Sequence, residues 1–182
     1  LPPPANDLCS GAIDITCSNY SGDNTYATDD ALPASTCGAT GDQNYKGVWF
    51  TINVPTTGSV TVSNCTGTTW DSYIRAYFGT CGTLTCVSNT TGVGYNDDGC
   101  SVQSSITFTA TASTDYYIYL SGYSSSDFGA YTITATCPQP PPTNDNCANA
   151  TAFPTVPTDG TCSTLSNQST AYATNSNVTP TG

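Results

Sequence analysis

The sequence predicts an all-β fold: a disulfide-rich β-sandwich, present as one full module followed by a partial second module. Three observations predict it. Short runs of apolar residues alternate with polar ones, cysteines are frequent, and the opening of the chain recurs after one domain length. Alternation with a period of two is typical of strands that bury one face, and no window shows the 3.6-residue period of an amphipathic helix.

The apolar runs predict the strands in chain order, and a turn at 55–58 joins the first two as a hairpin. About eight or nine short strands separated by turn signals indicate a sandwich. The rows expected to face the core are Val48, Phe50, Ile52 and Val54; Val60 and Val62; Ile74, Ala76 and Phe78; Ile106, Phe108 and Ala110; Tyr116, Ile118 and Leu120; and Tyr131, Ile133 and Ala135. Residues between these rows are expected on the outer faces: Trp49, Thr51 and Asn53; Tyr73, Arg75 and Tyr77; and Tyr117 and Tyr119.

The chain repeats its own opening. Residues 2–12 return as residues 140–150, an offset of 138, and Cys17 returns as Cys162. This period is far longer than that of solenoid repeats, so each copy should be a domain. Proline runs prefer the extended polyproline II form, which favours stiff spacers over floppy tethers between modules. The expected parts are a proline-rich lead-in at 1–5, a complete sandwich at 6–137, a proline-rich linker at 138–143 and the front of a second copy at 144–182, which would pack on a neighbouring subunit.

The cysteines indicate disulfides and therefore an oxidising, extracellular compartment. Zinc is disfavoured because the chain has no histidine and no Cys-x-x-Cys pair. Local turn residues favour Cys81–Cys86, and more weakly Cys65–Cys100, while the other pairings stay open. All ten cysteines are expected in disulfides: Cys9, Cys17, Cys37, Cys65, Cys81, Cys86, Cys100 and Cys137 in the full module, and Cys147 and Cys162 in the second.

The charge and the catalytic inventory exclude several functions. The 13 acidic residues are all Asp, against Lys46 and Arg75, so the net charge of −11 disfavours nucleic acid and anionic membranes as partners. The sequence contains no run of 18 apolar residues, so it does not predict a segment that inserts into a membrane. Without histidine the usual activation of a serine or cysteine nucleophile is missing, and no pattern sets two Asp carboxylates around a cleft. The sequence therefore predicts a protein that is not an enzyme.

Calcium is the one metal whose ligands the sequence offers, although no cofactor is expected to be required. Ca²⁺ binds six to eight oxygens from carboxylates, amides and backbone carbonyls. Asn and Asp are also common turn formers, so plain turns remain the alternative interpretation. The candidate ligands are Asn6, Asp7, Asp71, Asn96, Asp97 and Asp98.

Aromatic and asparagine residues provide two further hypotheses. Aromatic side chains could stack on sugar rings, or could simply occupy half-buried sheet faces: Tyr20, Tyr26, Tyr45, Trp49, Trp70, Tyr73, Tyr77, Tyr95 and Tyr123. Numerous Ser and Thr residues offer O-glycan sites, and N-glycosylation sequons begin at six positions: Asn19, Asn64, Asn89, Asn149, Asn167 and Asn177.

A series of short blocks then carries a family resemblance: Asn6-Asp7-x-Cys9-x-x-Ala12, Gly47-Val48-Trp49-Phe50, residues 60–65, Trp70-Asp71-Ser72-Tyr73-Ile74, Cys81-Gly82-x-Leu84-x-Cys86, Asn96-Asp97-Asp98, Tyr116-Tyr117-Ile118 and residues 131–137. In this order they resemble the pre-peptidase C-terminal-like β-sandwich repeats of secreted and cell-surface proteins of Bacteroidota. The resemblance covers 6–137 and restarts at 144. It implies a jelly-roll-like sandwich, export, and an accessory or adhesive role, with polymer or calcium binding in some members.

The partial second copy suggests how such a chain would be used. It lacks counterparts of residues 48–54 and of all later strands, so it cannot complete a sandwich alone. Either further modules follow, or the fragment supplies strands to another subunit, head to tail. We therefore expect a structural or adhesive repeat of a secreted bacterial surface filament or long adhesin, with copies of itself and glycans as partners. The alternative is a carbohydrate-binding accessory module of a secreted enzyme.

Overall fold

The computed structural model describes residues 1–29, 37–38, 44–89, 92–142, 145 and 173. The chain divides into two compact units, Leu1–Pro138 and Gln139–Gly182. The boundary between them falls at the start of the proline-rich linker expected at 138–143. The second copy expected at 144–182 lies outside the described residues, apart from 145 and 173. We call the first unit the module.

The module is all-β in its described residues, as the sequence predicts, with one short 3-10 turn at Cys9–Gly11. Within the described residues, no helix is long and apolar enough to cross a membrane. The strands are β1 Ile13–Asp14, β2 Asn19–Asp23, β3 Tyr45–Asn53, β4 Gly58–Ser63, β5 Ser72–Phe78, β6 Thr85–Cys86, β7 Ser88–Asn89, β8 Gly92–Val93, β9 Tyr95–Asn96, β10 Ser105–Ala110, β11 Asp115–Gly122 and β12 Ala130–Thr136.

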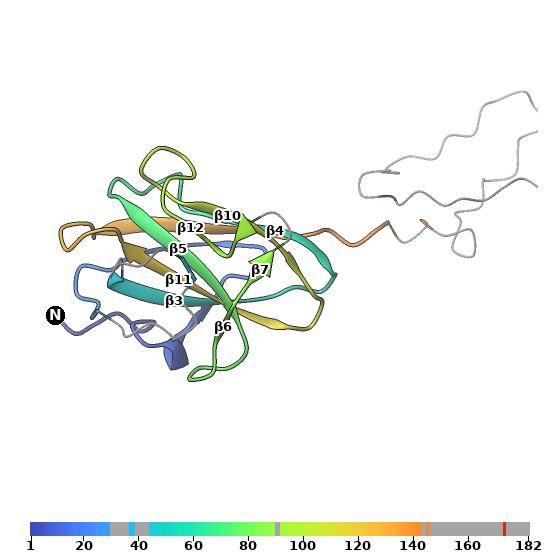
Figure 1. Cartoon of the computed structure of the whole chain (residues 1–182), viewed down its shortest axis with the longest axis horizontal. Helices are drawn as coiled ribbons and strands as arrows, with labels where there is room; N and C mark the ends of the chain where they lie inside the picture. The colour runs from blue at the N-terminus through green and yellow to red at the C-terminus, as the bar shows by residue number, and fades with distance from the viewer. Residues whose placement is uncertain (30–36, 39–43, 90–91, 143–144, 146–172, 174–182) are drawn as a thin grey trace, which may run out of the picture. The chain divides into compact units, whose positions relative to one another are not determined.

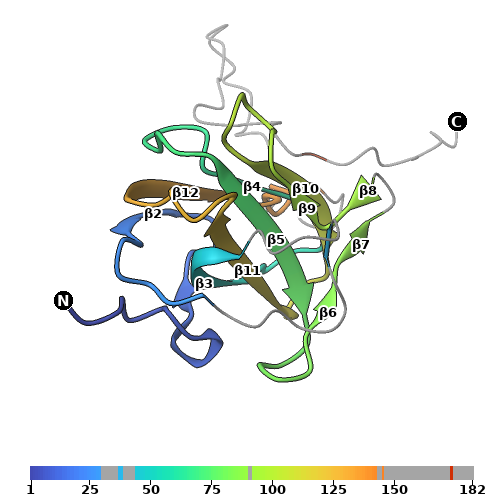
Figure 2. The same cartoon turned by 60° about the vertical axis from the view of Figure 1, so that its left-hand side comes forward.

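Two sheets form the sandwich (Figures 1 and 2). The larger sheet has the strand order β1-β3-β11-β5-β6, with β9 pairing separately on β5. The smaller sheet has the order β10-β4-β12-β2, and β7 and β8 form a separate pair. The main strands pair antiparallel, and β1 pairs parallel to β3. The fold is therefore a disulfide-rich β-sandwich, which confirms the predicted fold class.

The core lies between the two sheets and contains the predicted apolar rows. The inward residues of β3 and β11, such as Phe50 and Ile118, face those of β4, β10 and β12, such as Val62 and Ile133. One member of the rows departs from the prediction. Phe78 is the last residue of β5, where the sheet ends, and its side chain is 42% exposed.

The outer face of the larger sheet carries the aromatic residues that the alternation predicts there, and much of this face is also buried. Trp49, Tyr77 and Tyr119 pack into a second apolar cluster beneath loops that include Cys37 and Leu84. Alternation shows that a strand has two unlike faces, but it does not show that a loop covers the second one. The outer face of the larger sheet is thus buried around Trp49, Tyr77 and Tyr119, while Asn53 and Asp115 at its end are exposed.

The outer face of the smaller sheet carries hydroxyl groups instead of apolar side chains. Thr61 on β4 and Thr107 on β10 are register partners whose hydroxyl oxygens lie 2.9 Å apart. Ser21 on β2 and Thr132 on β12 repeat this arrangement at 2.9 Å. These side chains are exposed or half-buried, while their neighbours along β4, β10 and β12 are buried and those of Ser21 on β2 are half-buried. The uncharged, hydrogen-bonding face explains how a sheet with so little charge remains compatible with water.

Candidate functional site

Four disulfides are the dominant chemical feature of the module. They pair Cys9 with Cys81, Cys17 with Cys137, Cys37 with Cys86, and Cys65 with Cys100, at Cα–Cα distances of 5.8, 5.0, 5.2 and 5.8 Å. Their sequence separations are 72, 120, 49 and 35 residues, so every bridge joins segments that are distant along the chain. Cys147 and Cys162 lie outside the described residues.

The pairing differs in part from the local pairings that the sequence favours. Cys65 and Cys100 are joined, whereas the Cys81–Cys86 pairing was wrong. Cys81 and Cys86 lie on the hairpin between β5 and β6, in which Cys86 of β6 is the register partner of Tyr77 on β5. The hairpin does not close on itself. It holds two separate segments, the one at Cys9 and the one at Cys37, against the outer face of the larger sheet.

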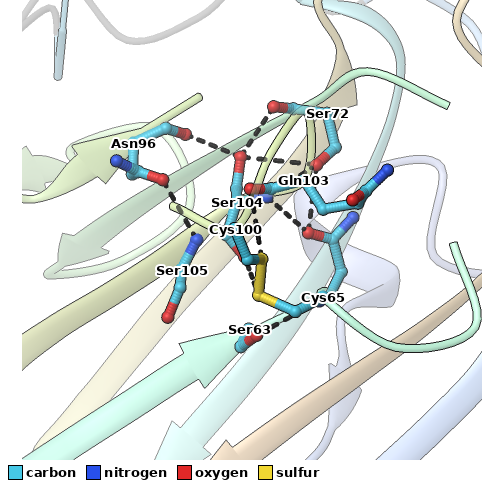
Figure 3. The surroundings of a disulfide bond; sticks show 9 residues. Ser63, Cys65, Ser72, Asn96, Cys100, Gln103, Ser104 and Ser105 are labelled. Atoms are coloured by element: carbon cyan, nitrogen blue, oxygen red, sulfur yellow. Dashed lines mark hydrogen bonds between the residues drawn. A yellow bond between two sulfur atoms is a disulfide. The ribbon is translucent and has the colours of Figure 1, made fainter. Parts of the chain in front are cut away.

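A buried polar cluster surrounds the Cys65–Cys100 bridge (Figure 3). The Asn64 side-chain oxygen accepts hydrogen bonds from the Ser72 hydroxyl at 3.0 Å and from the Ser104 backbone N–H at 2.9 Å. The Ser104 hydroxyl contacts the carbonyl oxygens of Ser72 at 2.6 Å and Asn96 at 2.8 Å. Asn64, Ser72 and Ser104 are all fully buried. The cluster therefore ties the start of β5 to the loops around β9 and β10 by hydrogen bonds alone.

The candidate calcium ligands do not come together as one site. Asn6 donates from its side-chain nitrogen to the Trp49 carbonyl at 3.0 Å. Both carboxylate oxygens of Asp7 accept hydrogen bonds from Thr28, at 2.6 Å from its N–H and 2.9 Å from its hydroxyl. The side-chain oxygen of Asn96 accepts the Ser105 N–H at 3.1 Å. These three residues hold backbone segments in place, as Asn and Asp commonly do.

The remaining candidates form a loose group of acidic residues. Burial raises the pKa of Asp71, and the nearby charges of Asp127, Asp98 and Asp97 raise it further. One carboxylate oxygen of Asp71 is buried and has no hydrogen-bond partner among the described residues. In the part of the chain that the structure describes, no three His, Cys, Asp or Glu side chains form a group that could hold a metal ion.

Arg75 is the buried cation of the module, and alternation alone did not reveal its role. Its Nε donates to the Cys37 carbonyl at 3.0 Å, and one terminal nitrogen donates to the Ser121 hydroxyl at 3.3 Å. Its guanidinium carbon lies 3.9 Å from the centre of the Tyr73 ring. Burial lowers the pKa of Arg75, and burial raises the pKa of Tyr77 to about 12. Arg75 thus holds the segment at Cys37 on the sheet by hydrogen bonds and cation–π contact.

The candidate sugar-stacking aromatics do not form an exposed row. Trp49, Trp70, Tyr73 and Tyr77 are buried, while Tyr20, Tyr45 and Tyr95 are half-buried. Tyr26 and Tyr123 are 50% and 41% exposed, and both lie outside the strands.

The candidate N-glycosylation asparagines also differ in their exposure. Asn19 is exposed on β2, at the edge of the smaller sheet. Asn64 is fully buried and hydrogen-bonded, so in the folded module a glycosyltransferase cannot reach it, which corrects its place among the candidates. The side chain of Asn89 is not described, and Asn149, Asn167 and Asn177 lie outside the described residues.

A cleft of about 300 Å³ opens where β5, β10 and β11 meet. The exposed ring of Phe78 lies beside threonine side chains and the ring of Tyr116. The sequence did not reveal this cleft, because its walls come from three strands, the loop before β11 and the residue between β6 and β7. Its lining residues are Phe78, Val87, Thr109, Thr111, Thr114 and Tyr116.

Comparison with known proteins finds a similar solved structure, at low sequence identity. No protein-family model matches the chain, and no curated protein matches it. Among solved structures the chain is similar to the pre-peptidase C-terminal domain of a collagenase from Bacillus anthracis. The sequence identity is 15%, the TM-score is 0.42, and the match covers 69% of this chain and 94% of that chain.

Proposed function

We propose that the chain is a non-enzymatic structural or adhesive repeat of an extracellular bacterial surface filament or long adhesin. One observation carries this proposal. A self-contained, disulfide-bonded unit ends at Pro138, and the sequence that opens the unit returns at Pro140. A domain that restarts directly after a proline-rich spacer is the pattern of a tandem or head-to-tail array.

The chemistry of the module supports an extracellular, non-catalytic role. Four disulfides in one small domain persist only in oxidising surroundings. The buried Arg75, Asn64 and Ser104 are engaged in hydrogen bonds that hold loops on the sheets. These three buried polar side chains thus serve the fold.

Imaging of the full chain by negative-stain electron microscopy, together with sedimentation over a range of concentrations, tests this proposal. Fibres or concentration-dependent oligomers are the expected result, since the front of a second copy would supply strands to another subunit. Single, monodisperse particles at every concentration would contradict self-assembly by this chain.

The exposed hydroxyls of the smaller sheet, among them Thr107, Thr109 and Thr136, suit a surface that carries O-glycans. We propose that native material is glycosylated on this face and at Asn19. The intact mass should then exceed the 18.8 kDa of the polypeptide. A native mass equal to that of the disulfide-bonded chain would contradict this proposal.

The cleft favours one second candidate, a carbohydrate-binding accessory module. An aromatic face beside several hydroxyl groups is a common way to hold a sugar ring, and Phe78 and Thr109 provide this combination. Affinity electrophoresis in gels that contain soluble polysaccharides tests it. Retardation that is lost in Phe78→Ala and kept in Tyr123→Ala would support the cleft, and equal mobility in every gel would exclude it.

A further inference from the structure

We infer a further function for one disulfide of the module. The Cys17–Cys137 bridge transmits tension past the sandwich, so that a chain pulled at its two ends does not extend the module. This inference deepens the proposed structural role, since it says how one repeat bears load, and its biological meaning rests on that role. The mechanical behaviour itself follows from connectivity and strand geometry alone.

The bridge lies on the shortest covalent path through the module. Cys17 precedes β2, and Cys137 follows β12 directly before Pro138 and the linker. A force that enters at residue 1 and leaves through Pro138 therefore passes along residues 1–17, across one disulfide, and out. All other residues of the module lie within the loop that this bridge closes, and no shorter covalent path between the two ends runs through them.

The geometry of β2 and β12 explains why the bridge matters at this position. The two strands are antiparallel neighbours, with Asn19 the register partner of Thr134, and the Ala135 N–H donates to the Ser18 carbonyl at 2.8 Å. Cys17 and Cys137 therefore lie at the same end of the pair. Forces that separate this end would break the ladder one hydrogen bond after another, because the bonds lie perpendicular to the strands and parallel to the pull. The disulfide joins the two strands at the end where this separation would begin.

The segment before Cys17 is itself attached to the rest of the module. The Trp49 N–H donates to the Asn6 carbonyl at 2.8 Å, the Asp7 carboxylate binds Thr28, and Cys9 is joined to Cys81. Cys81 lies inside the loop closed by Cys17–Cys137, so the Cys9–Cys81 bridge offers no shorter path while the larger loop is closed. The same is true of Cys37–Cys86 and Cys65–Cys100.

The number of residues within each disulfide loop predicts how far the chain extends under force when a bridge is removed. The Cys17–Cys137 separation of 120 residues corresponds to about 400 Å of extended chain at roughly 3.4 Å per residue. If this bridge alone is removed, Cys9–Cys81 still withholds its separation of 72 residues. The chain then gains the difference between 120 and 72, which is 48 residues or about 160 Å. Loss of all disulfides releases about 400 Å.

Single-molecule force spectroscopy on the full 182-residue chain, held by handles fused to both ends, tests the inference. Residues 139–182 contribute the same extension to every variant. Under oxidising conditions the wild type should release no increment beyond that of its two end segments. The double variant Cys17→Ser/Cys137→Ser should gain an increment of about 160 Å. The matched control, Cys65→Ser/Cys100→Ser, removes an equally intact bridge that lies off the path, and it should release no more than the wild type.

A second measurement covers the case in which the double variant does not fold. A phosphine reductant added to the oxidised wild type under constant force should release an increment of about 400 Å in one or more steps. Increments of hundreds of ångströms beyond the extension of the two end segments from the oxidised wild type, with all cysteines shown by mass spectrometry to be bonded, would overturn the inference. The two proposals fail separately. If the modules extend under force but still form filaments, only the mechanical inference is overturned. If the modules resist extension but never assemble, only the proposed function is overturned.

Discussion

Replacing both Cys17 and Cys137 by serine opens the longest loop of the module, and its equilibrium cost follows from loop length. A disulfide restricts the unfolded chain by an entropy that grows with the logarithm of the loop that it closes. A loop of 120 residues taken alone corresponds to about 5 kcal/mol. Because Cys9–Cys81 remains, the unfolded chain is already shortened, and the effective loop runs only from Cys9 to Cys17 and from Cys81 to Cys137, 64 residues in all. The expected loss is then about 4 kcal/mol.

The control Cys65→Ser/Cys100→Ser opens a loop of 35 residues, for which the same relation gives about 4 kcal/mol. The two double variants should therefore lose similar stability, although their extension under force should differ completely. Denaturant unfolding without reductant measures both, and Trp49 and Trp70, the two tryptophans of the chain, report on the module alone. An unchanged midpoint for the Cys17/Cys137 variant, or a loss several kcal/mol larger than that of the control, would refute this reasoning.

Three further predictions concern buried polar groups. Asn64→Ala should cost about 1–3 kcal/mol, since it removes the oxygen that the Ser104 N–H and the Ser72 hydroxyl share and leaves them only the contacts between Ser72 and Ser104. Asn19→Ala on the exposed edge should cost less than about 0.5 kcal/mol, and equal unfolding midpoints would contradict this. Because the pKa of Asp71 is raised, its contribution to the stability of the folded module is most favourable below the ordinary value of 3.8 and is lost as pH rises through the folded-state pKa. Asp71→Asn should therefore melt at a higher temperature than wild type at pH 7 in the presence of a chelator, and at the same temperature below pH 3.8. Calcium bound at Asp71 would reverse this order when Ca²⁺ is added. Tyr77, with its pKa raised to about 12, should stay protonated in the folded module while it ionises in the unfolded chain above pH 10. The free energy of unfolding should therefore fall as pH rises from 10 to 12. Tyr77→Phe should weaken this fall, and the same dependence on pH in the variant as in wild type would contradict the prediction.

The amino-acid sequence by itself determined the main strands β3, β4, β5, β10, β11 and β12 and, apart from Phe78, their inward faces. It did not show the short strands β1, β2 and β6–β9. The hairpin expected from the turn at 55–58 is wrong, because β3 and β4 lie in different sheets. The alternation in residues 48–54 and 131–135 is a local property, because successive side chains of a strand point to opposite faces. The core residues Phe50 and Ile133 are therefore where the pattern predicts them. The repeat at Pro140 likewise requires no tertiary information, since self-similarity can be read directly along the chain.

Only the tertiary structure decided which cysteines meet and which faces are covered. Cys17 and Cys137 are joined because β2 and β12 are neighbours in one sheet, a long-range pairing that local spacing does not contain. Trp49 is buried because a loop held by disulfides lies over it, while the equally alternating Thr61 remains part of an open hydroxyl face. Periodicity distinguishes the two faces of a strand, and the surroundings of each face depend on segments that are far away in the sequence.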